Sequence, residues 1–344
     1  MTGGGDCPGL NAIIQAVVTR ASELGYEVLG ILDGYEGLME GRVTSLGLSD
    51  VKELFDIGGT VLGTSRRNPF KSEEGVAKIL ETIRKHGIDA LIVIGGDDTL
   101  SAALKLSGHG VKVVGVPKTV DNDLSATDYS IGFLTAVETA AEAIRRLHTT
   151  ARSHRRVIVA EVMGRHAGWL TLMAGLAGGA HVILIPEKPL DIEEVCEIIR
   201  KREEAGEHYT IVAVAEGVKP SDMGDFVTLD EERDEYGHVR LGGIAKVLEK
   251  EIKKRTGKET RSVILGHVQR GGPPNAFDRI LGIRLGILAV DLVKEGKFGY
   301  AAVLKGREVV PVKLEEVVKG EGQVPKHFLE LTRFFSHVRE EREK

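Results

Sequence analysis

Short apolar segments alternate with amphipathic helical segments along this chain, and no other feature of the sequence constrains its fold as strongly. Residues 89–94, 157–162 and 209–215 are apolar almost throughout, as is typical of strands buried on both faces of a parallel sheet. Residues 12–24 and 73–86 instead repeat apolar side chains at helical spacing. Strands that alternate with helices in this way predict an α/β fold of the doubly wound type.

The alternation occurs in both halves of the chain, and many of the predicted strands end in a charged or glycine-rich tip. A chain of 344 residues has the length expected of two domains of about 150 residues each. Because open α/β sheets bind ligands beyond the carboxyl ends of their strands, these tips are the candidate binding positions. We therefore predict two doubly wound, mostly parallel-sheet lobes, with the active site in the cleft between their strand ends.

Composition and charge narrow the class of protein. A net charge of −5 argues against a general role on nucleic acids or membrane surfaces. No apolar stretch reaches the length of about 18 residues that a membrane span needs. The two cysteines, Cys7 and Cys196, lie far apart in the sequence and indicate a reducing compartment without a disulfide framework. We expect a cytoplasmic protein that binds neither nucleic acid nor a membrane.

Residues 117–123, with the sequence PKTVDND, follow a strand predicted at 111–116. They place two carboxylates, an amine and a hydroxyl at the carboxyl end of that strand, and such groups can deprotonate an alcohol and neutralise a phosphate. The alternative interpretation is an Asx-rich turn, in which Asn and Asp side chains bond their own backbone. The four side chains concerned are Lys118, Thr119, Asp121 and Asp123.

The strand predicted at 89–94 runs into Gly95, Gly96, Asp97 and Asp98, and a helix is predicted from 101 to 107. The glycines let the backbone approach a ligand closely. Two adjacent carboxylates at a strand end are costly unless a cation or a proton accompanies them, and Mg²⁺ usually takes one or two carboxylates plus phosphate oxygens. The alternative role for Asp98, or for Thr99, is helix N-cap, and that role is compatible with ligand binding.

Two further glycine-rich segments are candidate phosphate loops. Residues 1–11 open the helix predicted at 12–24, so backbone N–H groups and the helix dipole would face an anion. No strand precedes this loop, and we expect the N-terminus of the sequence to be incomplete. Residues 58–67 end in Arg66 and Arg67, which suit phosphate recognition, although a solvated basic pair is the alternative.

Four segments are predicted to be irregular or only partly regular. Residues 33–37 are predicted to form a turn, and the polar residues 219–240 a surface loop or a short excursion. After residue 299 we predict a strand at 301–304 and charged helical stretches, and residues 337–344 are predicted to form a solvated tail.

Seven motifs occur in an order and spacing that resemble the 6-phosphofructokinase family. The resemblance covers nearly the whole chain, and the combination is specific where any single glycine motif would not be. The motifs are GGGDCPGLN, GGTVLGTSR, GGDDTL, PKTVDND, EVMGRHAGW, AEG and LGHVQRGGPPNAFDR.

The resemblance implies reversible phosphoryl transfer to the 1-hydroxyl of fructose 6-phosphate, a step of glycolysis and gluconeogenesis, with Mg²⁺ as cofactor. Asp121 aligns with the general base of the family and Asp97 with its Mg²⁺ residue. The catalytic residues implied are Asp121, Lys118, Thr119 and Arg165; those that bind the donor are Gly5, Arg66, Gly96, Asp97, Asp98 and Thr99; those that bind the sugar phosphate are Thr119, Asp121, Asp123, Arg156, Met163, Gly164, Arg165, Glu216, Arg261, His267 and Arg270.

The resemblance also implies how the lobes divide the work. Residues 1–131 with 269–318 would form the lobe for the donor and Mg²⁺, and residues 132–268 with 319–344 the lobe for fructose 6-phosphate. Arg156 and Arg261 match arginines that reach into a neighbouring subunit's site, so a homodimer or homotetramer is implied.

The phosphoryl donor is predicted from two positions. Family members that use ATP typically carry Gly where this chain has Asp98, whereas members that use pyrophosphate resemble this chain in having Asp98 and Lys118. Asp98 would add bulk and negative charge where the α-phosphate of ATP passes, and like charges in a partly dry site repel strongly. We therefore predict pyrophosphate as the donor, with ATP as the alternative.

Two hypotheses from other functional classes compete with the phosphofructokinase hypothesis. A lipid or NAD kinase also uses a glycine–aspartate motif at a strand end, but it would leave the motifs around Met163 and His267 unexplained. A non-catalytic sugar-phosphate sensor would not need Asp121 and Asp97 together with a lysine. Formation of fructose 1,6-bisphosphate separates the phosphofructokinase reading from both.

Overall fold

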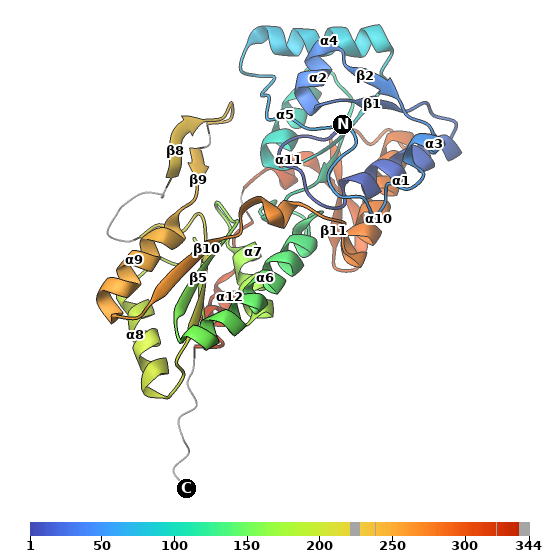
Figure 1. Ribbon diagram of the computed structural model, residues 1–344. Helices are drawn as coiled ribbons and strands as arrows, with labels where there is room; N and C mark the ends of the chain where they lie inside the picture. The colour runs from blue at the N-terminus through green and yellow to red at the C-terminus, as the bar shows by residue number, and fades with distance from the viewer. Residues whose placement is uncertain (221–227, 238, 321, 337–344) are drawn as a thin grey trace. The chain divides into compact units, whose positions relative to one another are not determined.

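Two units make up the computed structural model, which describes residues 1–220, 228–237, 239–320 and 322–336 (Figure 1). The first unit comprises Met1–Thr135, Arg233–His238 and Arg270–Gly322. The second comprises Ala136–Glu232, Val239–Gln269 and Gln323–Lys344. Each unit is an α/β structure with its own mostly or fully parallel sheet, so the predicted fold class is confirmed.

The first unit contains a four-stranded sheet with the order β12-β11-β4-β3. β3 (Leu91–Gly95), β4 (Val113–Pro117) and β11 (Tyr300–Lys305) run parallel, because the first two are buried apolar strands joined by a helix. β12 (Glu308–Lys313) is antiparallel to β11 and lies at the edge, where Pro311 is tolerated. The sequence prediction missed β12, because its polar residues and proline do not form an apolar run.

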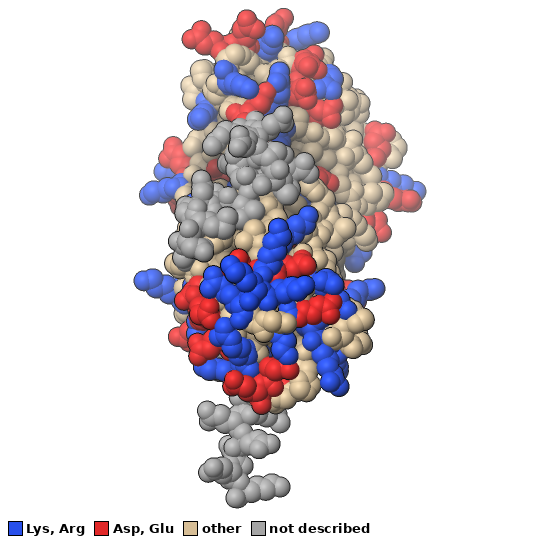
Figure 2. All heavy atoms as spheres, turned by 60° about the vertical axis from the view of Figure 1, so that its left-hand side comes forward, with Lys and Arg blue, Asp and Glu red and all other residues tan. Residues whose placement is uncertain are grey.

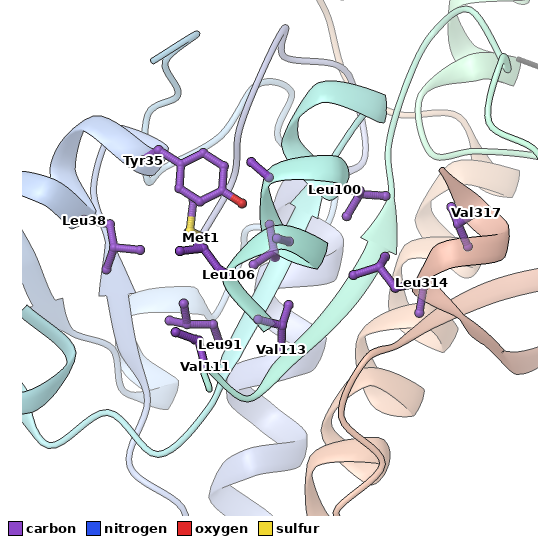
Figure 3. Packing of buried hydrophobic residues seen from close by; sticks show 14 of the residues in the cluster. Met1, Tyr35, Leu38, Leu91, Leu100, Leu106, Val111, Val113, Leu314 and Val317 are labelled. Carbon is purple, nitrogen blue, oxygen red and sulfur yellow. The ribbon is translucent and has the colours of Figure 1, made fainter. Parts of the chain in front are cut away.

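Helices cover both faces of this sheet. Side chains of α5 and α11 form one apolar cluster with strand residues such as Val113 and Ala301 (Figure 3). α10 contacts the same strands but contributes nothing to that cluster, so it lies on the other face, with α1 packed against it. The helices and remaining strands of this unit are α1 (Leu10–Glu23), β1 (Leu29–Ile31), α2 (Gly34–Glu40), β2 (Val43–Ser45), α3 (Leu48–Val51), α4 (Glu73–His86), α5 (Asp97–Gly108), α10 (Ala276–Lys294) and α11 (Leu314–Val317).

The first residues of the chain extend the sheet next to β3. Thr2 forms a parallel bridge with Ile94, the Gly3 N–H donates to the Ile94 carbonyl at 3.0 Å, and the Ile94 N–H donates to the Met1 carbonyl at 3.0 Å. Thr2 is 1% exposed. This pairing brings the glycine loop that follows it to the carboxyl end of β3.

The second unit contains a fully parallel sheet with the order β10-β5-β7-β6. α8 and α9 form an apolar cluster with one face of the sheet, and α7 contacts β6 and β7 without joining that cluster. The elements are α6 (Phe133–His154), which begins in the first unit, β5 (Val157–Val162), α7 (Trp169–Gly178), β6 (Val182–Leu184), α8 (Ile192–Glu204), β7 (Thr210–Ala215), α9 (Ile244–Thr256), β10 (Thr260–Ile264), the short 3-10 helices η1 (Gly266–Arg270) and η2 (Glu330–Arg333), and α12 (Lys326–Leu329).

Local predictions have mixed outcomes. Residues 33–37 begin the helix α2 rather than a simple turn. The segment 219–240, predicted as a surface loop or a short excursion, contains the paired strands β8 (Thr228–Arg233) and β9 (Val239–Leu241), so it is an excursion with regular structure. The helical stretches predicted after residue 304 amount in the described chain to short pieces of about one turn, α11 and α12 with η2. Residues 337–344, predicted as a tail, lie outside the described residues.

Charged side chains of both signs lie beside one another on the face drawn in Figure 2. Glu193 illustrates this mixing, because it pairs with Arg200 at 2.8 Å and with Arg255 at 3.2 Å. In the described part of the chain, no helix combines the length and apolar character that a membrane crossing requires.

Candidate active site

The two aspartates after β3 lie in the first turn of a helix. β3 ends at Gly95, Gly96 is the extended N-cap residue, and α5 begins at Asp97. The predicted start at residue 101 is therefore wrong, and so is the N-cap role considered for Asp98 and Thr99. Negative charge is stabilised at a helix N-terminus by the unpaired N–H groups and the dipole, which explains why two aspartates begin the helix here.

Thr99 packs beneath the glycines of this turn rather than facing solvent. It is 3% exposed, and a Cβ atom on Gly95 would lie 2.4 Å from the Thr99 Cβ. A Cβ atom on Gly96 would lie 3.4 Å from the Lys118 carbonyl oxygen. Glycine at position 95 therefore lets the first turn of α5 pack against the end of β3, and the Lys118 N–H donates to the Gly95 carbonyl at 2.9 Å, which brings the Asp97 turn next to the loop after β4.

The N-terminal glycine loop joins this pair of strand ends. Lys118 Nζ donates a hydrogen bond to the Gly5 carbonyl, and Arg270 Nη1 donates to the Asp6 carbonyl at 3.1 Å. A Cβ atom on Gly5 would lie 2.8 Å from Arg270 Nη1, so the backbone at Gly5 packs closely against the guanidinium group. The structure thus brings together Gly5, Lys118 and Arg270, three predicted site residues from distant parts of the sequence.

Lys118 is a buried cation at the centre of this arrangement. Its side chain is 3% exposed, and burial lowers its pKa, while the nearby thiol of Cys7 and the carboxylates of Asp6 and Asp123 act in the opposite direction. A buried ammonium group is retained where anionic partners compensate its desolvation. The position suits an amine that meets a phosphate group.

The loop after β4 is held by Asn122, a residue that the sequence analysis did not single out. Asn122 has a φ of 51°, its Nδ2 donates to the Asp128 carbonyl at 3.1 Å, and its Oδ1 accepts from the Ser130 N–H at 2.8 Å. The Ser130 hydroxyl in turn donates to the Thr119 carbonyl at 2.7 Å. The alternative of an Asx-bonded turn is therefore realised through Asn122, and the Oδ1 atom of Asp121 takes no part in it.

Asp121 carries an unusual carboxylate. Its N–H donates to Thr119 Oγ1 at 3.1 Å, which fixes the residue within the loop. Its Oδ1 atom is buried and has no hydrogen-bond partner among the described residues. Buried polar atoms are nearly always paired, so an unpaired carboxylate oxygen is the kind of group that a substrate hydroxyl can satisfy.

Asp123 shares its electrostatic environment with two other carboxylates. Burial, followed by the charges of Asp121 and Asp97, raises its pKa to about 7, while hydrogen bonds from its own backbone N–H and from Thr119 oppose the shift. Three aspartates thus lie close enough together to influence one another. Among the described residues, no group of three or more His, Cys, Asp and Glu side chains is arranged to hold a metal ion.

The raised pKa of Asp123 predicts that stability falls as the pH rises. Between the unfolded value near 3.8 and the folded value near 7, the native state holds a proton that the unfolded state releases, so the free energy of unfolding declines across that window. Asp123→Asn removes this titration, so its unfolding free energy relative to that of the parent should rise by about 4 kcal/mol from pH 4 to pH 8. Urea unfolding at both pH values measures it, with the exposed Glu74→Gln as a control; an equal difference at the two pH values would contradict the assignment.

Arg66 and Arg67 both pair with an acidic turn formed by residues 234–237. Arg66 Nη1 lies 3.4 Å from Asp234 Oδ2, and Arg67 pairs with Glu235. The alternative of a purely solvated basic pair is therefore wrong for this structure, although both guanidinium groups remain more than half exposed, at 57% and 53%. No signal in the sequence indicated this turn as a neighbour of Arg66.

In the second unit, several of the residues predicted to bind the sugar phosphate lie at the ends of β5 and β7. Met163, Gly164 and Arg165 follow β5, and the Gly217 N–H donates to the Gly164 carbonyl at 3.0 Å. A Cβ atom on Gly217 would lie 1.9 Å from the Arg165 carbonyl oxygen, so Glu216 is held beside Arg165 by close backbone packing. The buried Gln269 accepts from the Met163 N–H at 3.3 Å and thereby docks η1, with the exposed His267, against the same strand end.

Arg156 and Arg261 are not brought together with Met163 and Arg165. Arg156 precedes β5 and Arg261 is the second residue of β10, so both lie at the amino ends of parallel strands, opposite the strand tips just described. Both pair with Glu259, at 3.7 Å and 2.9 Å. Arg156 keeps a buried Nε atom without a hydrogen-bond partner among the described residues.

Most of the chain matches a known protein family. Residues 1–293 match the phosphofructokinase family. The chain belongs to the phosphofructokinase family. The pyrophosphate–fructose 6-phosphate 1-phosphotransferase of Amycolatopsis methanolica is 54% identical to it over 326 residues, which are 94% of this chain and 95% of that protein. The ATP-dependent 6-phosphofructokinase of Mycobacterium bovis is 48% identical over 327 residues, with 94% and 95% covered.

Solved structures agree with this membership. The T-state crystal structure of Pichia pastoris phosphofructokinase superposes with a TM-score of 0.83 at 33% identity, over 93% of this chain. The chain spans 35% of the length of that longer protein. The recognition made from the seven sequence motifs is confirmed, and the family is one of phosphotransferases.

Proposed function

We propose that this protein transfers a phosphoryl group from pyrophosphate to the 1-hydroxyl of D-fructose 6-phosphate, giving fructose 1,6-bisphosphate and phosphate reversibly. The observation that carries the proposal is the unpaired, buried Oδ1 atom of Asp121, in a loop that adjoins the Asp97 helix turn. A carboxylate oxygen without a partner is poised to accept a proton from a bound hydroxyl group. In this proposal the protein is cytoplasmic, and its reaction belongs to glycolysis and gluconeogenesis.

Asp121 acts as the general base in this mechanism. It takes the proton of the sugar 1-hydroxyl while that oxygen bonds to phosphorus, and the bond from the same phosphorus to the bridging oxygen of pyrophosphate breaks. Phosphoryl transfer depends on positioning and charge neutralisation more than on covalent catalysis. Lys118, Arg66 and Arg165 supply positive charge for the transferring and leaving groups, and Thr119 holds Asp121 through its backbone N–H.

Mg²⁺ is the proposed cofactor, and the carboxylates fit it. Asp97, with Asp98 and Thr99 beside it, begins α5, and the mutual influence of Asp97, Asp121 and Asp123 indicates an excess of negative charge that a cation would relieve. Mg²⁺ keeps most of its ligands from water and substrate phosphates, so a site with one or two protein carboxylates is what it needs. When bound, it neutralises phosphate charge.

Pyrophosphate is favoured over ATP as the donor. Asp98 adds a negative charge in the first turn of α5, where an α-phosphate would meet it, while Lys118 can neutralise a phosphate leaving group. The relative named for pyrophosphate use shares more of its sequence with this chain than the one named for ATP use, 54% against 48%. The second candidate, an ATP-dependent enzyme, rests on the latter relative.

The two lobes have distinct roles in this proposal. The first unit binds the donor and Mg²⁺ through Gly5, Gly96 and the residues around them. The second unit binds the sugar phosphate through the backbone at Gly164 and through four side chains. Those side chains are Met163, Arg165, Glu216 and His267. Arg156 and Arg261, at the opposite strand ends, reach the site of a neighbouring subunit in a homodimer or homotetramer.

A coupled assay of fructose 1,6-bisphosphate formation tests the proposal. Purified protein is given fructose 6-phosphate with Mg²⁺ and either pyrophosphate or ATP at equal concentrations. We expect turnover with pyrophosphate to exceed turnover with ATP. A clear preference for ATP would support the second candidate, and no bisphosphate with either donor would overturn the phosphofructokinase assignment in favour of a sensor or another kinase.

A further inference from the structure

The acidic turn, residues 234–237 between β8 and β9, contacts the basic segment 66–71. The two stretches are far apart in sequence, yet both belong to the first unit. Within this contact, Asp234 and Glu235 face three cations, which are Arg66, Arg67 and Lys71.

Glu235 is held firmly in this contact. Its carboxylate pairs with Arg67, accepts from the Asn68 backbone N–H at 2.9 Å, and lies 3.8 Å from Lys71 Nζ. The Asn68 N–H, followed by the charges of Arg67 and Lys71, lowers the pKa of Glu235. The hydroxyl of Tyr236 donates to the Arg67 carbonyl at 3.0 Å, so the turn is attached to the backbone of the basic segment as well as to its side chains.

Asp234 makes a looser contact. Its Oδ1 atom accepts from the Tyr236 N–H at 3.0 Å, which closes the turn, while its Oδ2 atom lies 3.4 Å from Arg66 Nη1. The Arg66 side chain is 57% exposed, and exposed ion pairs of this length contribute little to stability. The pair between Asp234 and Arg66 is therefore one that an incoming anion can replace.

We propose that Asp234 pairs with Arg66 in place of the donor phosphate and is displaced when pyrophosphate binds, while Glu235 is the positioning residue that anchors the turn. The proposal rests on the proposed function, in which Arg66 contacts the donor. A guanidinium group presents a limited fork of N–H donors, so a carboxylate and a phosphate compete for it. Asp234 thus weakens donor binding, whereas Glu235 favours it by ordering segment 66–71.

Two substitutions with the same change of charge are expected to act in opposite directions. Asp234→Asn keeps the Oδ1 acceptor that closes the turn but removes the charge that competes for Arg66, so the KM for pyrophosphate should fall about two- to fivefold, more than kcat changes. Glu235→Gln releases segment 66–71, so the KM for pyrophosphate should rise about threefold or more. Glu74→Gln, which removes an exposed carboxylate paired with Lys78 in the same unit, is the control and should leave both constants unchanged.

Two further measurements distinguish the mechanism from a general charge effect. In an Arg66→Ala background, Asp234→Asn should no longer change the KM for pyrophosphate, because the pair it breaks is already absent. Hydrogen exchange of the amides in 66–71 should accelerate in Glu235→Gln, since the Asn68 N–H loses a charged acceptor.

The outcomes separate this inference from the proposed function. If the unmodified protein neither binds nor turns over pyrophosphate, the proposed function fails. If it turns over pyrophosphate but Asp234→Asn behaves as Glu74→Gln does, or raises the KM, the competition is overturned. Unchanged exchange of segment 66–71 in Glu235→Gln would overturn the anchoring role.

Discussion

Asp121→Asn is expected to lower kcat for fructose 1,6-bisphosphate formation by about 10²–10⁴-fold, because loss of a general base typically has that effect. Asparagine preserves the size of the side chain and the backbone bond to Thr119, but its amide cannot take a proton. The buried Oδ1 position, which has no partner in the described chain, would then receive an uncharged oxygen. The KM for fructose 6-phosphate should change far less than kcat.

Steady-state kinetics at saturating pyrophosphate and Mg²⁺ measure this effect. Asp89→Asn is the matched control, because Asp89 is exposed and precedes β3 at the end of the sheet away from the site. Calorimetric measurement of fructose 6-phosphate binding to the Asp121→Asn variant checks that the site is intact. Near-normal turnover by the variant would remove Asp121 from the role of base.

The fold was predictable from the sequence where burial determines the residue pattern. β3, β5 and β7 are buried on both faces, so their apolar runs are nearly continuous and their ends are marked by glycine or charge. Edge strands lack that constraint. β12 is only partly buried, with Pro311 and alternating polar residues, and for this reason it was missed.

The candidate site was predictable in its residues but not in its local geometry. The start of α5 at Asp97 was missed because Asp and Thr are typical of turns, although they are also favoured in the first turn of a helix. The contact of Asp234 with Arg66 joins residues that are 168 positions apart, and no periodicity or spacing reports such a pair. The role of Asn122 had a weak signal, since Asn tolerates positive φ and sits between two aspartates.

Asp98→Gly is expected to change the donor preference. Removal of this carboxylate takes both negative charge and volume from the first turn of α5, so kcat/KM with ATP should rise by about tenfold or more, and kcat/KM with pyrophosphate should fall by a similar factor. Asp98 is also one of the charges, after burial, that raise the pKa of Tyr236. Its carboxylate therefore acts on neighbours in the folded protein, and its removal is not a purely local change.

Asp98→Asn separates charge from size, because it keeps the volume of the side chain and removes its charge. If repulsion of the α-phosphate excludes ATP, Asp98→Asn should recover most of the ATP use of Asp98→Gly; if bulk excludes it, only glycine should. The double variant Asp98→Gly/Lys118→Gly tests the leaving-group role, since loss of the buried amine should lower turnover with pyrophosphate further. No gain with ATP in any of these variants would mean that Asp98 does not select the donor. Because the amine of Lys118 also bonds to the Gly5 carbonyl, its loss loosens the glycine loop as well, so the contribution of the Asp98 carboxylate is measured by comparing Asp98→Gly alone with the unmodified protein.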